Sequence, residues 1–285
     1  MNAINGAVSA LFDLVLTPLE LLGVPLTLIL VSGVFGILAL IAFKYISYQR
    51  GIKAAKDKIK GHMIAIRIYQ DDLAVVGKSV GSVLLRNFQY LGLNFGPFVP
   101  LAIPFVFVVA QMVVRFGFAP VPVTPDPTTL MPGKGTMVRV ELSEGHERDV
   151  SGLSVEIPDG LVATSKLVRV PARGLAFQEV AAVRPGSYEL AFTLPDGTRE
   201  TKQLVAGDEP TRTMQPERVK SFFGAMLWPA EAAFASSSPF ERIRFEYPES
   251  DLGWMPGGPV GILIVFVVAS MAFGFAVLKP LGVQI

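Results

Sequence analysis

A single apolar run constrains this chain more than any other feature of its sequence. The run is VPLTLILVSGVFGILALIAF, residues 24–43, twenty residues without a charge. An α-helix of that length is about 30 Å long, which matches the hydrocarbon thickness of a bilayer. The run therefore predicts a transmembrane helix. A cleavable signal peptide has Lys or Arg before its apolar run. No Lys or Arg precedes this run, so we expect the helix to be retained.

Basic residues follow the run directly and set the expected topology. Lys and Arg near the end of a span resist translocation, so residues 44–96 are predicted to be cytoplasmic and the N-terminus to lie outside. This segment carries nine Lys or Arg residues and three Asp residues, a net charge of +6. Its apolar residues recur at spacings of three and four, which predicts a helical hairpin. The basic surface of the hairpin comprises Lys53, Lys56, Lys58, Lys60 and Arg67.

Two further apolar stretches complete the predicted set of three spans. Residues 97–117 run from inside to outside, and residues 258–279 run back and leave a cytoplasmic tail, 280–285. Near the outer end of the second span, Arg115 is expected to snorkel to the headgroups, whereas Gln111 needs a polar partner or water. Hydrophobic residues make up 51% of the chain and charged residues 17%, a balance typical of a membrane protein.

The first 23 residues carry apolar side chains on one face, but they include Asp13, Glu20 and Pro18. The stretch is short and charged for a span, so it is predicted to be an interfacial helix on the outer surface. The alternative is that it extends the first span.

A polar region lies between the second and third spans and is therefore predicted to be outside. Residues 118–134 are Pro-rich and indicate a stiff linker. Across residues 135–209, apolar and polar residues alternate with period two between Pro, Gly and Asp, which predicts an immunoglobulin-like β-sandwich. The clearest hairpin turn is Pro195-Asp196-Gly197.

A second interfacial helix is predicted at residues 215–235, lying on the outer leaflet. A further strand, IRFEYP, is expected before the third span. Aromatic residues favour the membrane–water interface, and the predicted interfacial anchors are Phe222, Phe223, Trp228 and Trp254.

The sequence offers little for catalysis. It has no Cys, and its two histidines, His62 and His146, fall on opposite sides of the predicted membrane. A thiolate site or a histidine metal site is therefore not expected. The carboxylates of the β-region form no visible dyad and read as a solubilising surface. We expect no enzymatic activity, no cofactor and no metal.

Polar groups in or beside the spans suggest a hydrophilic groove open to the cytoplasm. Such a groove would lower the cost of bringing a polar segment into the bilayer. The simpler interpretation of Lys44 is a topological anchor, because a Lys at a span end snorkels at small cost. The groove candidates are Lys44, Gln49, Arg50, Gln111, Ser32 and Ser270.

The order of elements resembles the YidC/Oxa/Get superfamily of membrane protein insertases. The similar stretches are FDLVLTPLELLGVPLTLILV, IAFKYISYQRGIKAAKDKIK with the basic hairpin behind it, and NFGPFVPLAIPFVF. The three-span arrangement is similar to the short archaeal members and to the third subunit of the ER membrane protein complex. The resemblance implies transfer of hydrophobic segments into the bilayer through a groove containing a basic residue, for which Lys44 lies nearest. The β-domain between the second and third spans departs from the family pattern.

The sequence thus predicts an α-helical protein of the cytoplasmic (inner) membrane with three transmembrane helices, a cytoplasmic hairpin and an inserted extracytoplasmic β-sandwich. Its expected function is that of an insertase or insertion chaperone. Its expected partners are the lipid bilayer and nascent membrane proteins or the ribosome; no specific nucleic acid is expected. The alternative is a structural scaffold subunit that docks other membrane-complex subunits through its β-domain.

Overall fold

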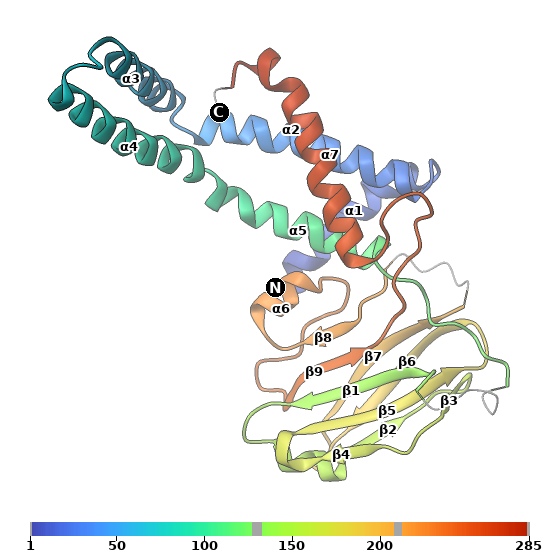
Figure 1. Ribbon diagram of the computed structural model, residues 1–285. Coiled ribbons are helices and arrows are strands. Elements are labelled where there is room, and N and C mark those ends of the chain that lie inside the picture. Colours follow the sequence, from blue (N-terminus) through green and yellow to red (C-terminus); the bar gives the residue numbers. More distant parts are fainter. Residues whose placement is uncertain (1, 127–132, 208–212, 284–285) are drawn as a thin grey trace. The chain divides into compact units, whose positions relative to one another are not determined.

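The computed structural model describes residues 2–126, 133–207 and 213–283 (Figure 1). The chain divides into two compact units, residues 1–27 with 106–264 and residues 28–105 with 265–285. Three long helices pass from one unit into the other: α2 (Val24–Ile46), α5 (Phe98–Phe116) and α7 (Gly258–Leu281).

Four described stretches are helical, long and apolar enough to cross a membrane. They are α1 (Asn2–Glu20), α2, residues 73–116 and α7. Two of them, α2 and α7, have a mean hydropathy of 2.7, whereas α1 reaches only 1.2. These helices indicate a membrane protein. By length and composition α1 also qualifies as a span. The structure therefore does not restrict the protein to the three predicted transmembrane helices.

In the unit of residues 28–105 and 265–285, small residues bring α2 and α7 into backbone contact. A Cβ atom on Gly36 would clash with the carbonyl oxygen of Ser270, and one on Gly33 would clash with the Phe273 ring. Close approach through small residues is a common way to pack helices in lipid. The rings of Phe35, Phe105 and Phe266 join α2, α5 and α7, with centroids 5.1 to 6.2 Å apart.

The same unit contains the helical hairpin, formed by α3 (Gln49–Ile68) and α4 (Leu73–Phe95). The two helices contact each other along their length. The carboxylate of Asp72 accepts hydrogen bonds from the amides of Ala74 and Val75, which caps the start of α4.

The other unit contains a β-domain of two antiparallel sheets. The larger sheet has the order β3-β5-β1-β9-β8, with β4 also paired to β5, and the smaller has the order β2-β6-β7. The strands of the larger sheet are β1 (Thr136–Leu142), β3 (Leu161–Ala163), β4 (Val168–Val170), β5 (Leu175–Ala182), β8 (Glu217–Val219) and β9 (Phe240–Phe245). Those of the smaller sheet are β2 (Ser154–Glu156), β6 (Gly186–Thr193) and β7 (Arg199–Ala206). Short 3-10 helices occupy Glu147–Gly152 and Pro171–Arg173.

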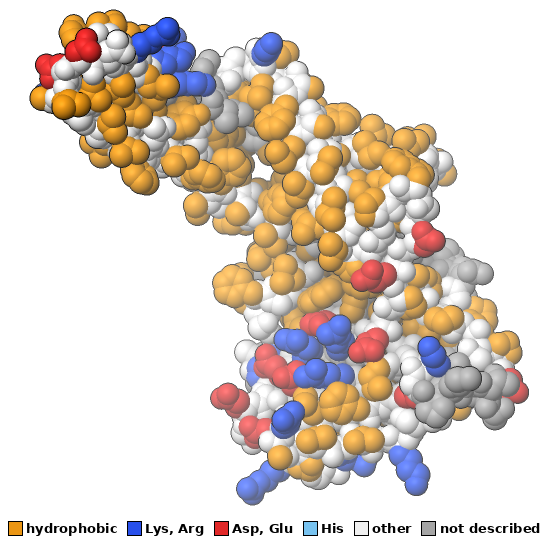
Figure 2. All heavy atoms as spheres, in the orientation of Figure 1, with side chains coloured by type: hydrophobic (Ala, Val, Ile, Leu, Met, Phe, Trp, Pro, Cys, Tyr) orange, Lys and Arg blue, Asp and Glu red, His pale blue; other side chains and the backbone are white. Residues whose placement is uncertain are grey.

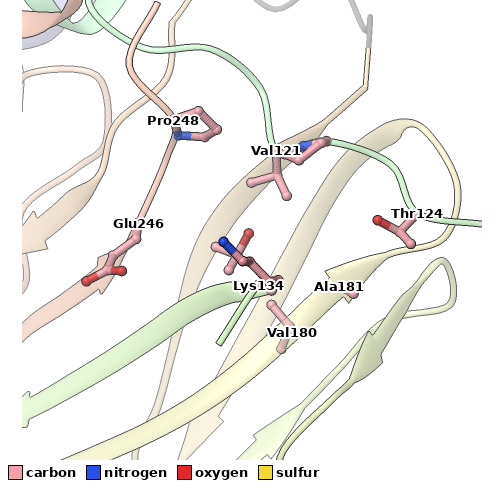
Figure 3. Close-up of a pocket in the computed structure, with 10 residues that line it drawn as sticks. Val121, Thr124, Lys134, Val180, Ala181, Glu246 and Pro248 are labelled. Atoms are coloured by element: carbon pink, nitrogen blue, oxygen red, sulfur yellow. The ribbon is translucent and has the colours of Figure 1, made fainter. Parts of the chain in front are cut away.

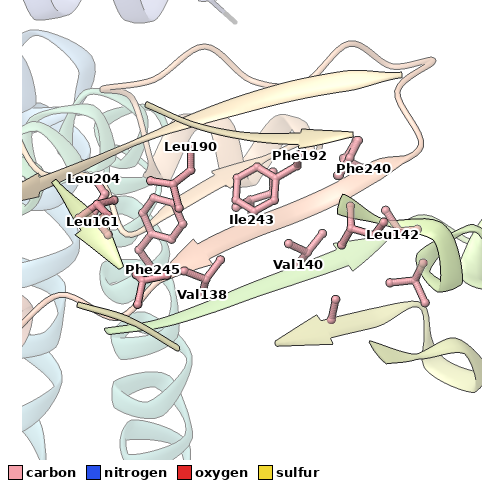
Figure 4. Close-up of a cluster of buried hydrophobic side chains, with 14 of the residues drawn as sticks. Val138, Val140, Leu142, Leu161, Leu190, Phe192, Leu204, Phe240, Ile243 and Phe245 are labelled. Carbon is pink, nitrogen blue, oxygen red and sulfur yellow. The ribbon is translucent and has the colours of Figure 1, made fainter. Parts of the chain in front are cut away.

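One hydrophobic core lies between the two sheets (Figure 4). In β1, Val138, Val140 and Leu142 are buried, whereas Arg139 and Glu141 between them are partly exposed. This is the period-two alternation that the sequence predicts for a half-buried strand. The predicted hairpin turn is also present: the amide of Leu194 donates to the Thr198 carbonyl at 2.9 Å, and Gly197 adopts a φ of +85°.

The β-domain is larger than the predicted residues 135–209. The expected extra strand forms as β9, which lies beside β1 in the larger sheet, and β8 pairs with β9. The predicted helix at residues 215–235 is wrong for most of its length. Glu217–Val219 is strand β8, and only Phe222–Leu227 is helical, as α6. At the C-terminal end, Pro229 disfavours helical backbone at the residue before it, so α6 stops at Leu227. At the N-terminal end, residues 217–219 pair with β9 and form a strand.

The start of the predicted linker is also part of the β-domain. Val121 forms a bridge to Ala206 of β7, and Val123 forms a bridge to Ala182 of β5. Residues 127–132 of that linker lie outside the described part of the chain. Because residues 118–124 bond to both sheets, the β-domain is not joined to α5 by a free tether.

Candidate functional site

An apolar stripe runs along the outer side of helix α4. Val80, Leu84, Phe88, Leu91 and Phe95 are all exposed, and they recur at spacings of four, four, three and four. That spacing places them on one face of the helix. Figure 2 shows hydrophobic side chains gathered over this part of the hairpin. A stripe of this size needs an apolar neighbour, because exposed apolar surface costs about 25 cal/mol per Å² in water.

The basic side chains of the hairpin lie mainly on its other helix. Lys53, Lys58, Lys60 and Arg67 are exposed on α3, and Lys56 is partly buried and takes part in an interaction. Figure 2 shows blue side chains beside the apolar surface of the hairpin. The hairpin therefore combines an apolar surface with a cationic one.

Three of the groove candidates, Ser32, Ser270 and Gln49, bond to residues close to them in sequence. Ser32 and Ser270 donate to the carbonyl oxygens of Leu28 and Val267 in their own helices. Gln49 bonds to the hydroxyl of Ser47. Ser32 is fully buried, so its side chain offers nothing to an incoming segment. Arg50 is exposed.

Lys44 has a specific structural contact. Its Nζ donates to the carbonyl oxygen of Leu281 at 2.8 Å, at the last residue of α7. The last carbonyl groups of a helix lack intrahelical partners, and a cation is favourable at this end of the helix dipole. Lys44 therefore fastens the end of α2 to the end of α7, whether or not it also contacts a substrate.

Helix α1 turns a polar stripe toward the protein and apolar side chains away from it. The stripe consists of Asn2, Asn5, Ser9 and Asp13, spaced by three, four and four residues. The amide of Asn5 donates to the Ala225 carbonyl at 2.7 Å, and Asn2 bonds to Ala233. The opposite side exposes Ile4, Leu11, Leu14 and Val15.

The polar stripe of α1 also provides the partners of the polar residues in α5. Gln111 donates to the hydroxyl of Ser9 at 2.8 Å, which supplies the polar partner it was expected to need. Arg115 forms an ion pair with Asp13 at 2.5 Å, and its side chain is only 1% exposed. The expectation that Arg115 snorkels to the headgroups is therefore wrong. The pair joins residues 102 apart, so no local pattern could have shown it.

A second buried cation lies in the β-domain. Lys202 on β7 is fully buried, and its Nζ donates to the Glu231 carboxylate at 3.0 Å and to the Gln215 carbonyl at 2.7 Å. Burial lowers the pKa of Lys202 and raises the pKa of Glu231, because each charged form loses solvation. The side chain of Gln215 also accepts hydrogen bonds from the amides of Ala230 and Glu231. This network attaches residues 215–231 to β7.

Sequence reasoning missed Lys202, although a signal was present. In β7, Lys202 shares its face with the core residues Leu204 and Ala206. A lysine on the inward face of a strand needs a buried anionic partner. The alternation therefore gave a reason to look for a carboxylate, but not for Glu231 in particular.

The predicted interfacial anchors occupy different environments. Phe222 and Phe223 on α6 are exposed, as is Trp254 in the turn before α7. Trp228 is partly buried, and its ring lies 6.1 Å from that of Phe118. Three of the four predicted anchors are therefore exposed, whereas Trp228 contributes to packing.

A small open pocket lies in the β-domain, at the edge where the segment after α5 crosses the sheets (Figure 3). Its lining includes Val121 and Thr124 from that segment, Val180 from β5, Lys134 just before β1 and Glu246 just after β9. None of the predicted site residues lines it. Among the described residues, no cluster of His, Cys, Asp and Glu is suited to hold a metal ion.

Comparisons with protein-family models, with curated proteins and with solved structures gave no match to this chain. Its function is therefore inferred from its own residues.

Proposed function

We propose that the protein is an insertase or insertion chaperone that receives hydrophobic segments on the α3–α4 hairpin and passes them into the bilayer. The observation that carries the proposal is the apolar stripe of α4, from Val80 to Phe95, beside the basic helix α3. An apolar helix face can accept the apolar face of another helix, and the cationic surface attracts anionic headgroups or ribosomal RNA.

The position of the hairpin supports this proposal. α3 begins three residues after the end of α2, and α4 is followed almost directly by α5. A segment bound to α4 would therefore lie next to the apolar helices and have a short path into lipid. The contact between Lys44 and Leu281 fastens the ends of α2 and α7, which would keep this end of the helices in place during transfer.

Site-specific photocrosslinking tests the proposal. A photoreactive residue at Phe88, on the apolar stripe, should crosslink to nascent membrane proteins during their synthesis in membranes that contain the full chain. The same residue at Val168, a comparably exposed apolar position on β4, serves as the matched control. Crosslinks to lipid alone at Phe88 would contradict the proposal, because the stripe would then face the bilayer permanently.

A variant provides the functional arm of the test. Leu84→Ser combined with Phe88→Ser should lower insertion of small membrane proteins several-fold, whereas Val168→Ser should not change it. Unchanged insertion across a broad set of clients in the double variant would also contradict the proposal.

The second candidate function is that of a scaffold subunit in a larger membrane complex. It is favoured by the firm attachment of the β-domain, because Val121 and Val123 bond to both sheets directly after α5. The small residues Gly33 and Gly36 contact α7 of the same chain, which leaves them unavailable to a foreign helix. Crosslinks from Phe88 to one stable protein, independent of translation, would favour the scaffold over the insertase.

A further inference from the structure

The β-domain is fastened to the ends of two apolar helices. Ser250 is the central residue of this attachment. Its hydroxyl donates to the Phe116 carbonyl at the end of α5, and its amide donates to the Gly117 carbonyl at 3.2 Å. Its own carbonyl accepts a hydrogen bond from the amide of Gly258, the first residue of α7, at 3.1 Å. The amide of Met214 also donates to the Val114 carbonyl in the last turn of α5, at 2.7 Å.

Helix α6 lies at this same junction. The ring of Trp228, directly after α6, contacts the ring of Phe118, two residues beyond the end of α5. The carbonyl of Ala225 within α6 accepts a hydrogen bond from the side-chain amide of Asn5 in α1. α6 is therefore held between the end of α5 and the N-terminal half of α1.

The side of α6 that faces away from the protein is aromatic. Phe222 and Phe223 are 61% and 72% exposed, and their rings meet edge to face with centroids 5.7 Å apart. Leu227, one turn further on, is exposed as well. Trp254 stands 75% exposed four residues before α7, whose start is bonded to Ser250. Aromatic side chains at the end of a membrane helix favour the boundary between headgroups and acyl chains.

The exposed side chains of helix α1 indicate which solvent surrounds α6 and α1. A helix beside water buries its apolar side and exposes its polar side. α1 departs from this pattern: the two residues that it buries are Asn5, which contacts α6, and Leu16, whereas Leu11 and Leu14 are exposed. The exposed leucines cost free energy in water and lower it where the surrounding solvent is apolar.

We propose that α6, the outward side of α1 and Trp254 form one bilayer-contact surface that seats the β-domain on the membrane. The partner is lipid, at the boundary of headgroups and acyl chains in the leaflet on the side of the β-domain. The β-domain is then held at a fixed height and orientation by Phe222 and Phe223. This inference does not rest on the insertase proposal, because none of its residues belongs to the α3–α4 hairpin.

Tryptophan quenching by brominated lipid tests this surface. The chain has only two tryptophans, so Trp228→Phe with Trp254→Phe gives a silent background. Phe222→Trp and Phe223→Trp are added to it one at a time, with Val168→Trp on β4, 56% exposed before substitution, as the matched control. Each full-length variant is reconstituted, one copy per disc, in nanodiscs of phosphatidylcholine brominated near the carboxyl end of its acyl chains.

We expect the brominated lipid to quench the fluorescence of both α6 variants, Phe222→Trp and Phe223→Trp, severalfold more than that of the control. Aqueous acrylamide should show the reverse order. Equal quenching of all three variants would overturn the proposal. Protection from acrylamide without quenching by lipid would overturn it too, because a protein segment would then cover α6. If the substitutions in α6 prevent folding, Trp228→Phe alone leaves native Trp254 as the reporter, and its quenching by the brominated lipid decides in the same way.

Discussion

Helix α1 and strand β1 each place one kind of side chain toward the protein and another away from it, but they do so in opposite senses. In β1 the inward residues are Val138 and Val140, and Arg139 faces outward. In α1 the buried Asn5 faces inward, and Leu14 is 76% exposed. The burial pattern of β1 is that of a domain in water, whereas the exposed leucines of α1 support the lipid contact proposed above, although both elements belong to the same unit of the chain.

The comparison extends to the two buried cations. Lys202 and Glu231 meet in the interior of the β-domain, where both partners are withdrawn from solvent. Arg115 is equally buried, but its partner Asp13 is 43% exposed. A buried charge is costly unless it is paired, and the cost of losing the partner grows as solvent is excluded. The two pairs should therefore respond differently when one carboxylate is removed.

The largest effect is expected for Glu231→Ala. The variant leaves Lys202 buried without its carboxylate, and breaking a buried pair in this way typically costs about 3–5 kcal/mol. Urea unfolding of the full chain in nanodiscs, followed by tryptophan fluorescence, measures the loss. Glu156→Ala breaks the exposed ion pair with Arg199 and should cost about 1 kcal/mol or less. Similar losses in the two variants would refute the distinction.

The pH dependence of Glu231→Ala gives an independent check on its cause. Burial already lowers the pKa of Lys202, and loss of the carboxylate removes the main influence that raises it. The unfolded chain then binds a proton that the folded chain does not, so stability rises with pH up to the ordinary pKa of lysine. The deficit of the variant should shrink between about pH 7 and about pH 9.5. A deficit independent of pH would point to lost packing instead.

A smaller effect is expected for Asp13→Ala. It removes the partner of Arg115, and a hydrogen bond to a charged group is worth about 1.5–3 kcal/mol. Because Asp13 is partly exposed, water and headgroups replace some of the lost interaction. A double-mutant cycle with Arg115→Met, measured as unfolding in nanodiscs, isolates the energy of the pair. A coupling energy near zero would mean that Arg115 is stabilised by groups other than Asp13.

Local sequence patterns were sufficient for the elements that each form from one continuous stretch. Helices α2 and α7 follow from uninterrupted apolar runs, and β1 and β6 follow from alternation. The predicted turn at Pro195–Gly197 needed only the residues within it. In these cases the length or the periodicity of the apolar residues within the stretch itself predicts the element.

The elements that were missed depend on residues far apart in the chain. β8 becomes a strand because β9, about twenty residues later, supplies its partner, so the helix-like pattern around Phe222 was misleading. The polar stripe of α1 is explained by Gln111 and Arg115 of α5, which bond to it and lie 102 residues away in the sequence. Among the groove candidates, the hydrogen bond of Ser32 lies within its own helix and can be predicted from that helix alone. The partner of Lys44 is the end of α7, which the sequence around Lys44 does not reveal.

The comparison of solvents predicts a modest effect for Leu14→Asn. If α1 faces lipid, placing an amide there should cost about 1–2 kcal/mol of unfolding free energy in nanodiscs. Val168→Asn makes a similar change on the water-facing β4 and should stay within about 0.5 kcal/mol of the parent. Equal and negligible effects in both variants would place the outward side of α1 in water.

The smallest effect concerns the solvent-exposed turn of the β-domain. The carboxylate of Asp196 accepts hydrogen bonds from the amide of Thr198 at 2.9 Å and from its hydroxyl at 2.8 Å. These bonds favour the charged form and lower the pKa of Asp196 below its ordinary value. The folded state therefore gains stability from Asp196 above that ordinary value and loses it as the pH falls through the lowered pKa. Asp196→Asn should shift the urea midpoint of the full chain slightly downward at about pH 7 and by less at about pH 2.5, where part of the carboxylate is protonated. A shift of the same size at both values would show that the turn depends on the shape of the side chain and not on its charge.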